Sequence, residues 1–75
     1  MVKWSGGTRR MTAHMGDLTL EARNRDHDAE WCIFVPGMYS TLWLKSGSEA
    51  TLAEAMQAAE DAKEFAKSIL DAFSD

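Results

Sequence analysis

The side chains best suited to chemistry in this sequence are one cysteine and two histidines. A cysteine becomes a nucleophile when a histidine or another base lies beside it. Here Cys32 stands in a run of β-forming residues, whereas His14 and His27 fall at an expected strand end and turn. No local catalytic signature surrounds the cysteine, and free cysteine is among the most buried residue types. We therefore expect Cys32 to be structural and the protein not to be an enzyme.

Acidic side chains, which metal binding or acid–base catalysis would need, are grouped in two places along the sequence. The Asp-His-Asp segment at 26–28, with Glu30 beyond it, has metal-ligand residue types but not the spacing of a zinc site or a calcium loop. The second group, in the C-terminal segment, comprises Glu54, Glu60, Asp61 and Glu64. The first is expected to be a solvated turn and the second the hydrated face of a helix. No metal or cofactor is predicted.

Length and composition limit the architecture that can carry these residues. A chain of 75 residues, 45% hydrophobic, is expected to form a single domain over 1–75. Its one cysteine rules out an intrachain disulfide. No apolar run approaches the roughly 20 residues that cross a bilayer, and the first residues do not resemble a signal peptide. We therefore expect a cytoplasmic protein that has no membrane partner.

The net charge of −4 is unevenly distributed. Residues 1–45 carry six basic and five acidic side chains, whereas residues 46–75 carry two lysines and seven acidic side chains. An acidic chain repels phosphates, which disfavours direct binding of DNA or RNA. The acidic tail either keeps the protein soluble or mimics a nucleic-acid backbone. A predicted basic sheet edge, which either blocks unwanted strand pairing or binds a partner, comprises Arg9, Arg10, Arg23 and Arg25.

The C-terminal segment predicts a helix over 51–73. Thr51 and Glu54 form a capping box, and no proline or glycine follows. Apolar residues recur at spacings of three and four, namely Leu52, Ala55, Ala59, Ala62, Ala66, Ile69 and Phe73. The first half of this stripe is mostly alanine, which allows close packing on a sheet. A helix of about 22 residues is about 33 Å long, whereas strands span about 20 Å, so its bulky end is expected to overhang.

Upstream, the hydrophobic period changes to two. Leu18, Leu20 and Ala22 alternate with polar residues, which indicates a half-buried strand. Further strands are predicted at 9–14, 30–35 and 38–45, with turns at 15–17, 24–28 and 36–37. Residues 1–8 are expected to be flexible. The prediction is an α+β fold in which a three- to four-stranded antiparallel sheet over 9–45 is packed by one long C-terminal helix.

A tight turn at Pro36-Gly37 sets a register in which residue 35 lies opposite 38, 33 opposite 40 and 31 opposite 42. The core face then collects Trp31, Ile33, Val35, Met38, Leu42 and Leu44. The other face shows an aromatic patch of Phe34, Tyr39 and Trp43 beside Glu30, Cys32 and Thr41. A loop one residue longer would move one strand's side chains to the opposite face. The patch is covered by a protein partner, by the segment carrying Trp4, or by a second copy of the chain.

The order of strands, a tryptophan at Trp31, and a helix start Thr51-Leu52-Ala53-Glu54-Ala55 with an alanine-rich continuation resemble small uncharacterised proteins of bacteriophages and prophages. The resemblance covers residues 11–66, and its motifs are a helix cap and an alanine packing face. It implies no catalytic activity. It implies a phage setting, in the host cytoplasm, where small acidic proteins bind and block host complexes; anti-CRISPR proteins are one such group.

Two hypotheses follow from these patterns. In the first, the chain is a non-enzymatic module that binds and inhibits a host protein complex. In the second, it is a structural or assembly protein that homodimerises through its C-terminal helix. The candidate partner-binding residues are Phe34, Tyr39 and Trp43 on the sheet and Phe65, Ile69 and Phe73 on the helix.

Overall fold

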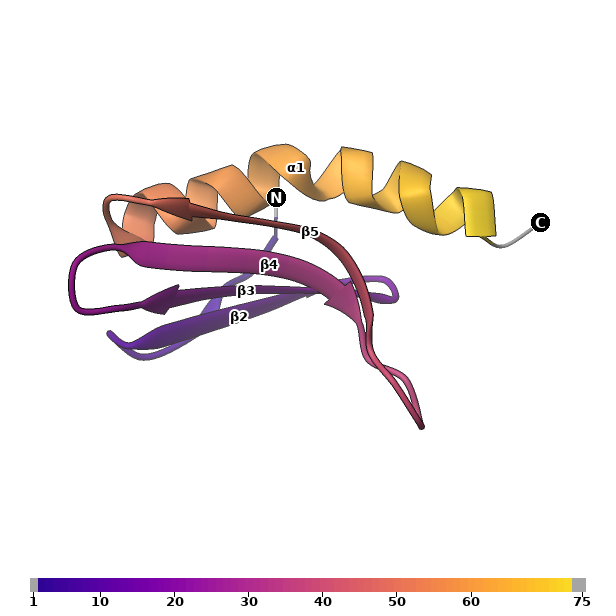
Figure 1. Ribbon diagram of the computed structural model, residues 1–75, viewed down its shortest axis with the longest axis horizontal. Coiled ribbons are helices and arrows are strands. Elements are labelled where there is room, and N and C mark those ends of the chain that lie inside the picture. The colour runs from indigo at the N-terminus through magenta and orange to yellow at the C-terminus, as the bar shows by residue number, and fades with distance from the viewer. Residues whose placement is uncertain (1, 74–75) are drawn as a thin grey trace.

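The computed structural model describes residues 2–73 as an antiparallel sheet with one helix across one of its faces (Figure 1). The elements are β1 (Ser5–Gly6), β2 (Arg10–Met15), β3 (Leu18–Asn24), β4 (Ala29–Val35), β5 (Leu42–Glu49) and α1 (Leu52–Phe73). The five strands lie in sequence order, so each pairs only with its neighbours along the chain. The predicted α+β class, with an antiparallel sheet and a C-terminal helix, is confirmed. The sheet has five strands, not three or four.

The central strands carry the core on the face that α1 covers. Leu20 lies between Ala13 of β2 and Ile33 of β4, and Ala22 lies opposite Trp31. All five of these side chains are buried. Because successive residues of a strand point to opposite faces, the alternation read from the sequence sends this set toward the helix.

The connection between β2 and β3 is a two-residue turn that depends on a glycine. Met15 pairs with Leu18, which leaves Gly16 and Asp17 as the central residues. Gly16 has φ of +60°, and no non-glycine residue among 2–73 has a positive φ. A positive φ at the first central position only is typical of a type II′ turn, whose twist matches that of the flanking strands.

Helix α1 packs on the sheet through short side chains. Ala55, Ala59 and Ala66 are fully buried, so the helix lies close to β3, β4 and β5. At its start, the Glu54 amide donates to Thr51 Oγ1 at 3.2 Å, and that hydroxyl donates to Glu54 Oε1 at 3.0 Å. In Figure 1 the last turns of α1 pass beyond the ends of the strands, as the lengths predict. Among residues 2–73, no helix has the length and apolar character that crossing a membrane requires.

The N-terminal segment contains a short strand that the sequence analysis does not predict. Residues 1–8 are expected to be flexible, but Ser5 and Gly6 pair with Thr12 and Met11 to form β1. Upstream of β1, the partly buried side chain of Trp4 packs against the core. Burial of a large indole offsets the entropy of ordering a short segment. Residue 1 lies outside the described residues.

The β4–β5 hairpin differs from the predicted register. The pairs are Val35 with Leu42, Phe34 with Trp43, and Ile33 with Lys45, so the loop spans six residues and Leu44 is an extra residue in a bulge. The predicted pairing of 35 with 38 is therefore wrong. A two-residue turn joins strands whose first pair flanks the turn directly. Here the first pair is Val35 with Leu42, and six residues lie between them.

In the observed register, two of the expected core residues are exposed to solvent. Met38, predicted to lie under the helix, is 90% exposed in the loop. Leu42 is 37% exposed, whereas Trp31 and Ile33 are buried as predicted. Val35 and Leu44 pack against the core while remaining partly exposed. The residues of β4 that face the helix are thus predictable from the sequence, whereas the residues of β5 that pair with them are not.

Strand β5 is also longer at its end than predicted. The predicted strand ends at residue 45, but Ser46, Gly47 and Ser48 also pair, with Cys32, Trp31 and Glu30. β5 forms one edge of the sheet, and on the other side β1 covers only Met11 and Thr12 of β2.

Candidate functional site

The face of the sheet opposite α1, called the open face below, holds most of the predicted site residues. Strand pairing arranges its side chains in three rows that run across the sheet. These rows are His14, Thr19, Phe34 and Trp43; Thr12, Glu21, Cys32 and Ser46; and Arg10, Arg23, Glu30 and Ser48. The open face is therefore aromatic at one end and charged at the other.

A hollow of about 540 Å³ lies on the open face. Its lining includes Glu21, Arg23, Arg25, Glu30, Cys32, Trp43, Ser46 and Ser48. The cavity joins the charged row to the edge of the aromatic row.

The aromatic row is built around a contact between neighbouring strands. The rings of Phe34 and Trp43 lie opposite each other, with centroids 4.9 Å apart and planes inclined at 48°. A tilted pair at this distance is a favourable arrangement for aromatic quadrupoles. Phe34 is half-buried, while Trp43 remains 65% exposed. The pair thus presents an apolar surface to solvent.

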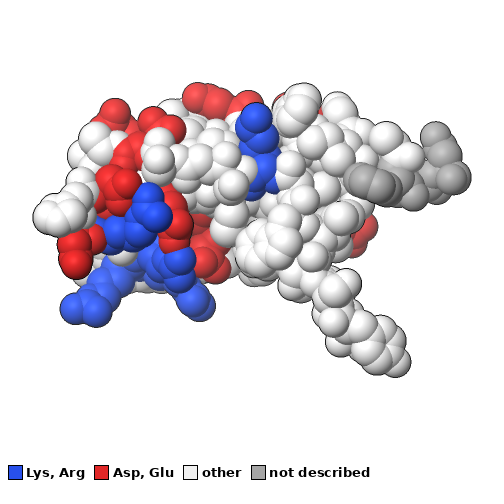
Figure 2. Space-filling model, viewed as in Figure 1, with Lys and Arg blue, Asp and Glu red and all other residues white. Residues whose placement is uncertain are grey.

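Tyr39 does not join this pair. It lies in the loop of residues 36–41, where it is 94% exposed beside the exposed Met38. Figure 1 shows the loop projecting away from the helix, and in Figure 2 the same loop is an uncharged protrusion. The structure therefore replaces the predicted patch of three rings with an aromatic pair and a separate apolar loop tip.

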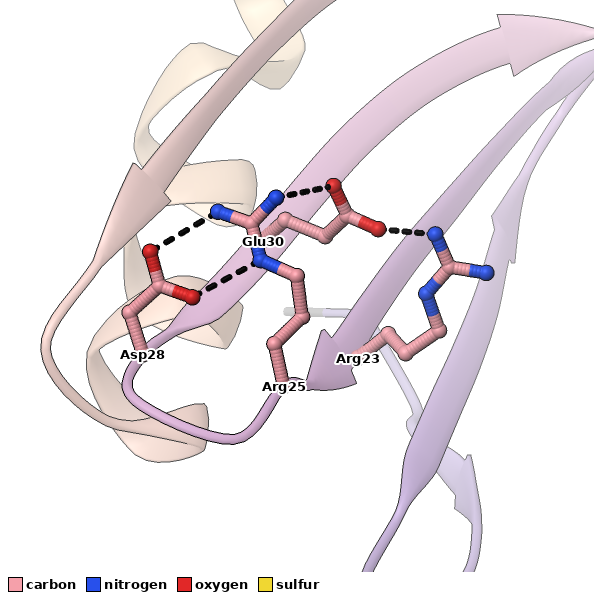
Figure 3. Close-up of polar contacts among 4 residues, drawn as sticks. All are labelled: Arg23, Arg25, Asp28 and Glu30. Atoms are coloured by element: carbon pink, nitrogen blue, oxygen red, sulfur yellow. Dashed lines mark hydrogen bonds and ion pairs between the residues drawn. The ribbon is translucent and has the colours of Figure 1, made fainter.

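At the other end of the open face, four charged side chains form a continuous chain (Figure 3). Arg25 Nε and Nη2 donate to the two carboxylate oxygens of Asp28 at 2.7 and 2.8 Å. Arg25 Nη1 also donates to Glu30 Oε2 at 3.1 Å, and Arg23 donates to the other oxygen of Glu30. Glu30 therefore bridges two guanidinium groups, one from β3 and one from the β3–β4 turn.

The charges in this chain compensate one another. The hydrogen bond from Arg25 holds the pKa of Asp28 below its ordinary value, and the same bond raises the pKa of Arg25. The hydrogen bond to Glu30 likewise raises the pKa of Arg23. Figure 2 shows the basic and acidic groups intermixed at this end of the molecule. Within this chain, the two positive and two negative groups cancel in charge.

Cys32 lies between the aromatic and charged rows. Burial, followed by the nearby charges of Glu21 and Glu30, raises the pKa of its thiol to about 11. The thiol is therefore protonated at neutral pH, and a thiol is a much weaker nucleophile than a thiolate. This environment is consistent with a structural cysteine.

The turn that carries Asp26 and His27 does not assemble a metal site. Within residues 2–73, no three histidine, cysteine, aspartate or glutamate side chains converge as metal ligands would. Asp28, the third member of the segment, is engaged by Arg25. His14 Nδ1 lies 3.4 Å from Thr19 Oγ1, on the adjacent strand of the open face.

The predicted helix residues lie apart from the open face. Phe65 is 56% exposed, with the Lys45 ammonium of β5 5.1 Å from its ring centroid. Ile69, one turn further along, is half-buried. Phe73 is the last residue of α1, and its side chain lies outside the described part of the structure. The described side chains of the predicted set therefore lie in three places: the Phe34–Trp43 pair, Tyr39 in the loop, and Phe65 with Ile69 on the helix.

Sequence reasoning missed the charged chain, although a signal for it was present. The sequence pattern predicts a basic edge that includes Arg23 and Arg25, and a solvated turn that includes Asp28. In a hairpin whose turn is centred on residues 26–27, Arg23 and Glu30 are equally distant from the centre. They are therefore expected to lie opposite each other, and they do. Opposite charges at such positions predict a cross-strand ion pair.

Comparison of the chain with known protein families, curated proteins and solved structures found no match. The resemblance to bacteriophage and prophage proteins therefore depends on the sequence motifs alone.

Proposed function

We propose that this protein is a non-enzymatic protein-binding module that uses the Phe34–Trp43 pair and the loop of residues 36–41. The observation that carries the proposal is the exposure of Met38, Tyr39 and Trp43, at 90, 94 and 65%. Tyrosine and tryptophan are enriched among the residues that dominate binding energy at interfaces. A projecting loop can enter a recess of a partner while the ring pair at its base contacts the rim.

The chemistry of the open face favours a protein partner over a nucleic acid. Binding of a phosphate backbone requires unpaired cationic groups. Arg23 and Arg25 instead donate to Glu30 and Asp28, and the whole chain carries a net charge of −4. The uncharged loop tip and the ring pair supply apolar contact area, which suits a protein surface.

The sharper form of the proposal is that the partner is a host protein complex and that binding inhibits it. This form draws its support from the resemblance to phage proteins and from the small size and acidity of the chain. In its most specific version, the protein is an anti-CRISPR-type inhibitor acting in the cytoplasm of the bacterial host.

The test is capture of a partner from host lysate by the tagged chain, followed by binding measurements with the purified partner. Tyr39→Ala and Trp43→Ala are expected to weaken binding by about tenfold or more. Phe65→Ala, also an exposed aromatic residue but on the helix, is the matched control and should bind normally. Circular dichroism verifies that each variant is folded. Undiminished affinity in both loop and sheet variants would refute this assignment of the surface.

A second candidate function is self-assembly through the end of α1. It is favoured by the overhang of the helix in Figure 1 and by the 56% exposure of Phe65. In this case Phe65 and Ile69 would pack against a second copy. Light scattering at high micromolar concentration tests it directly, because a strict monomer would exclude it.

A further inference from the structure

Strand β5 leaves one edge of the sheet unpaired along eight residues. Among the described residues it pairs with β4 on one side only, and on the opposite side of the sheet β1 covers only Met11 and Thr12 of β2. Along an unpaired edge, every second residue directs its backbone N–H and C=O groups outward, where another strand can bond to them. No residue of β5 is buried.

The two halves of this edge differ in their ability to pair. The first half contains the bulge at Leu44, and bulges blunt an edge by bending it. From Lys45 to Glu49 the pairing with β4 is regular. The three residues between these two are Ser46, Gly47 and Ser48, which are small and include no proline. A second strand can therefore approach this half closely.

The charges on this half specify which strand fits it. Lys45 and Glu49 pair with Ile33 and Ala29, which are buried under the helix, so both project to the helix side of the sheet. They lie two residues to either side of Gly47. An antiparallel strand with the same sequence, centred on the same glycine, places its glutamate opposite Lys45 and its lysine opposite Glu49.

We propose that β5 pairs antiparallel with β5 of a second copy of this chain, with Gly47 opposite Gly47 about a two-fold axis. The register forms two Lys45–Glu49 pairs between the copies. It also sets Ser46 opposite Ser48 on the open face. The absence of a side chain at the central glycines allows close approach where the axis passes.

Neighbouring registers are less favourable. In an antiparallel pair of strands, opposite residues must project from the same face of the sheet. The register can therefore shift only in steps of two. One shift places Lys45 opposite Lys45 and another places Glu49 opposite Glu49, and like charges directly opposite are destabilising. The intermediate shifts leave both charged residues without an opposite charge. The proposed register is the one that pairs all four.

The same arrangement accounts for the position of Phe65. A two-fold axis perpendicular to the joined sheet places both helices on one face. Phe65 lies on the β5 side of α1, as its contact with Lys45 shows. Its exposed ring therefore faces the second copy. The open face, with the Phe34–Trp43 pair and the loop of residues 36–41, remains uncovered, so this dimer goes beyond the proposed partner binding.

The test is sedimentation equilibrium of the full chain from low to high micromolar concentration, with charge-reversed variants. Lys45→Glu and Glu49→Lys each convert two attractive pairs into two repulsive ones. Each is expected to raise the dimer dissociation constant about tenfold or more. The double variant restores opposite charges and should return the constant to within about threefold of the native value.

Lys67→Glu and Glu64→Lys make the same changes in net charge on the exposed part of α1 and should leave the dimer intact. Hydrogen exchange within residues 46–48 provides a second readout, because the protection of the amides that point outward from the edge should rise with protein concentration. A monomer throughout the range, or a double variant that stays as weak as the single ones, would overturn the proposal. A dimer insensitive to both reversals but lost in Ile69→Ala would instead be formed by the helix end. Tyr39→Ala, by contrast, should leave the dimer unchanged even where it abolishes partner binding.

Discussion

The indole ring of Trp31 lies directly against Gly47 of the neighbouring strand. An added Cβ at Gly47 would lie 2.8 Å from Cζ2 and 2.9 Å from Nε1 of that ring. Trp31 is 7% exposed, and its Nε1 has no hydrogen-bond partner among the described residues. The glycine is therefore a packing requirement of the tryptophan, because a side chain at this position would overlap the ring.

Gly47→Ala is expected to destabilise the fold by about 1–3 kcal/mol, because a rigid buried ring cannot yield to the new methyl group without strain. Urea unfolding at low protein concentration measures this change without a contribution from dimerisation. Gly7→Ala is the matched control, since nothing lies within 4 Å of a Cβ at that position. Equal stability of the two variants would contradict the packing argument.

Thr51 is expected to contribute to stability through the helix cap. Thr51→Ala removes the acceptor of the Glu54 amide and should cost about 1 kcal/mol of unfolding free energy. Thr51→Ser retains the hydroxyl and should recover most of that loss. Chemical denaturation of the three proteins checks the prediction, and an alanine variant as stable as the serine variant would count against it.

The ion pair between Arg25 and Asp28 gives a defined dependence of stability on pH. The pKa of Asp28 is lowered from 3.8 in the folded state, so its contribution is complete above that value and disappears as pH falls through the folded-state pKa. A carboxyl titration followed by NMR should place the midpoint for Asp28 below 3.8.

Arg25→Gln should return that midpoint toward 3.8. Asp28→Asn should lower stability slightly at neutral pH, and its difference from the native chain should vanish in acid. Asp26→Asn, a charge-removing change in the same turn but outside the ion pairs, is the matched control and should leave the low midpoint of Asp28 in place. Retention of the low midpoint in the Arg25 variant would show that the guanidinium is not its cause.

The Cys32 thiol is expected to react slowly with alkylating reagents. A rise in pKa from 9.0 to about 11 lowers the thiolate fraction near pH 8 by about a hundredfold relative to the unfolded chain. Alkylation by iodoacetamide in buffer and in denaturant measures that ratio. Rates that are equal in the two conditions would contradict the assigned environment.

The same shift predicts a loss of stability in alkali. Between pH 9.0 and about 11 the unfolded chain has released the thiol proton while the folded chain retains it. The unfolding free energy should therefore fall as pH rises through this range. Cys32→Ser should lack this part of the decline.

The sequence determined the elements whose signals are local. The helix start at Thr51 and the stripe of Ala55, Ala59 and Ala66 depend on residues three or four apart, so neighbouring residues specify them without reference to the sheet. The alternation of Leu18, Leu20 and Ala22 likewise identified the buried face of β3. Both predictions required only the period of the pattern.

Part of the candidate site followed from the parity of the loop length, that is, from whether the loop between β4 and β5 has an even or odd number of residues. The actual loop of residues 36–41 is four residues longer than the predicted turn, and a change of an even number leaves each side chain on its face. Phe34 and Trp43 were therefore placed correctly on one face, although their direct contact was not foreseen. Tyr39 was lost from the patch because the longer loop removes it from the sheet.

The tertiary structure alone decided the edge of the sheet. The bulge at Leu44 reverses the parity of the residues beyond it, which sends Lys45 and Glu49 to the helix side and extends β5 through Gly47. A bulge has no local sequence signature here, because it arises where the paths of β4 and β5 must both satisfy packing under α1. The pairing of β1 has the same origin, since burial of Trp4 against a core made by distant residues is what orders the segment.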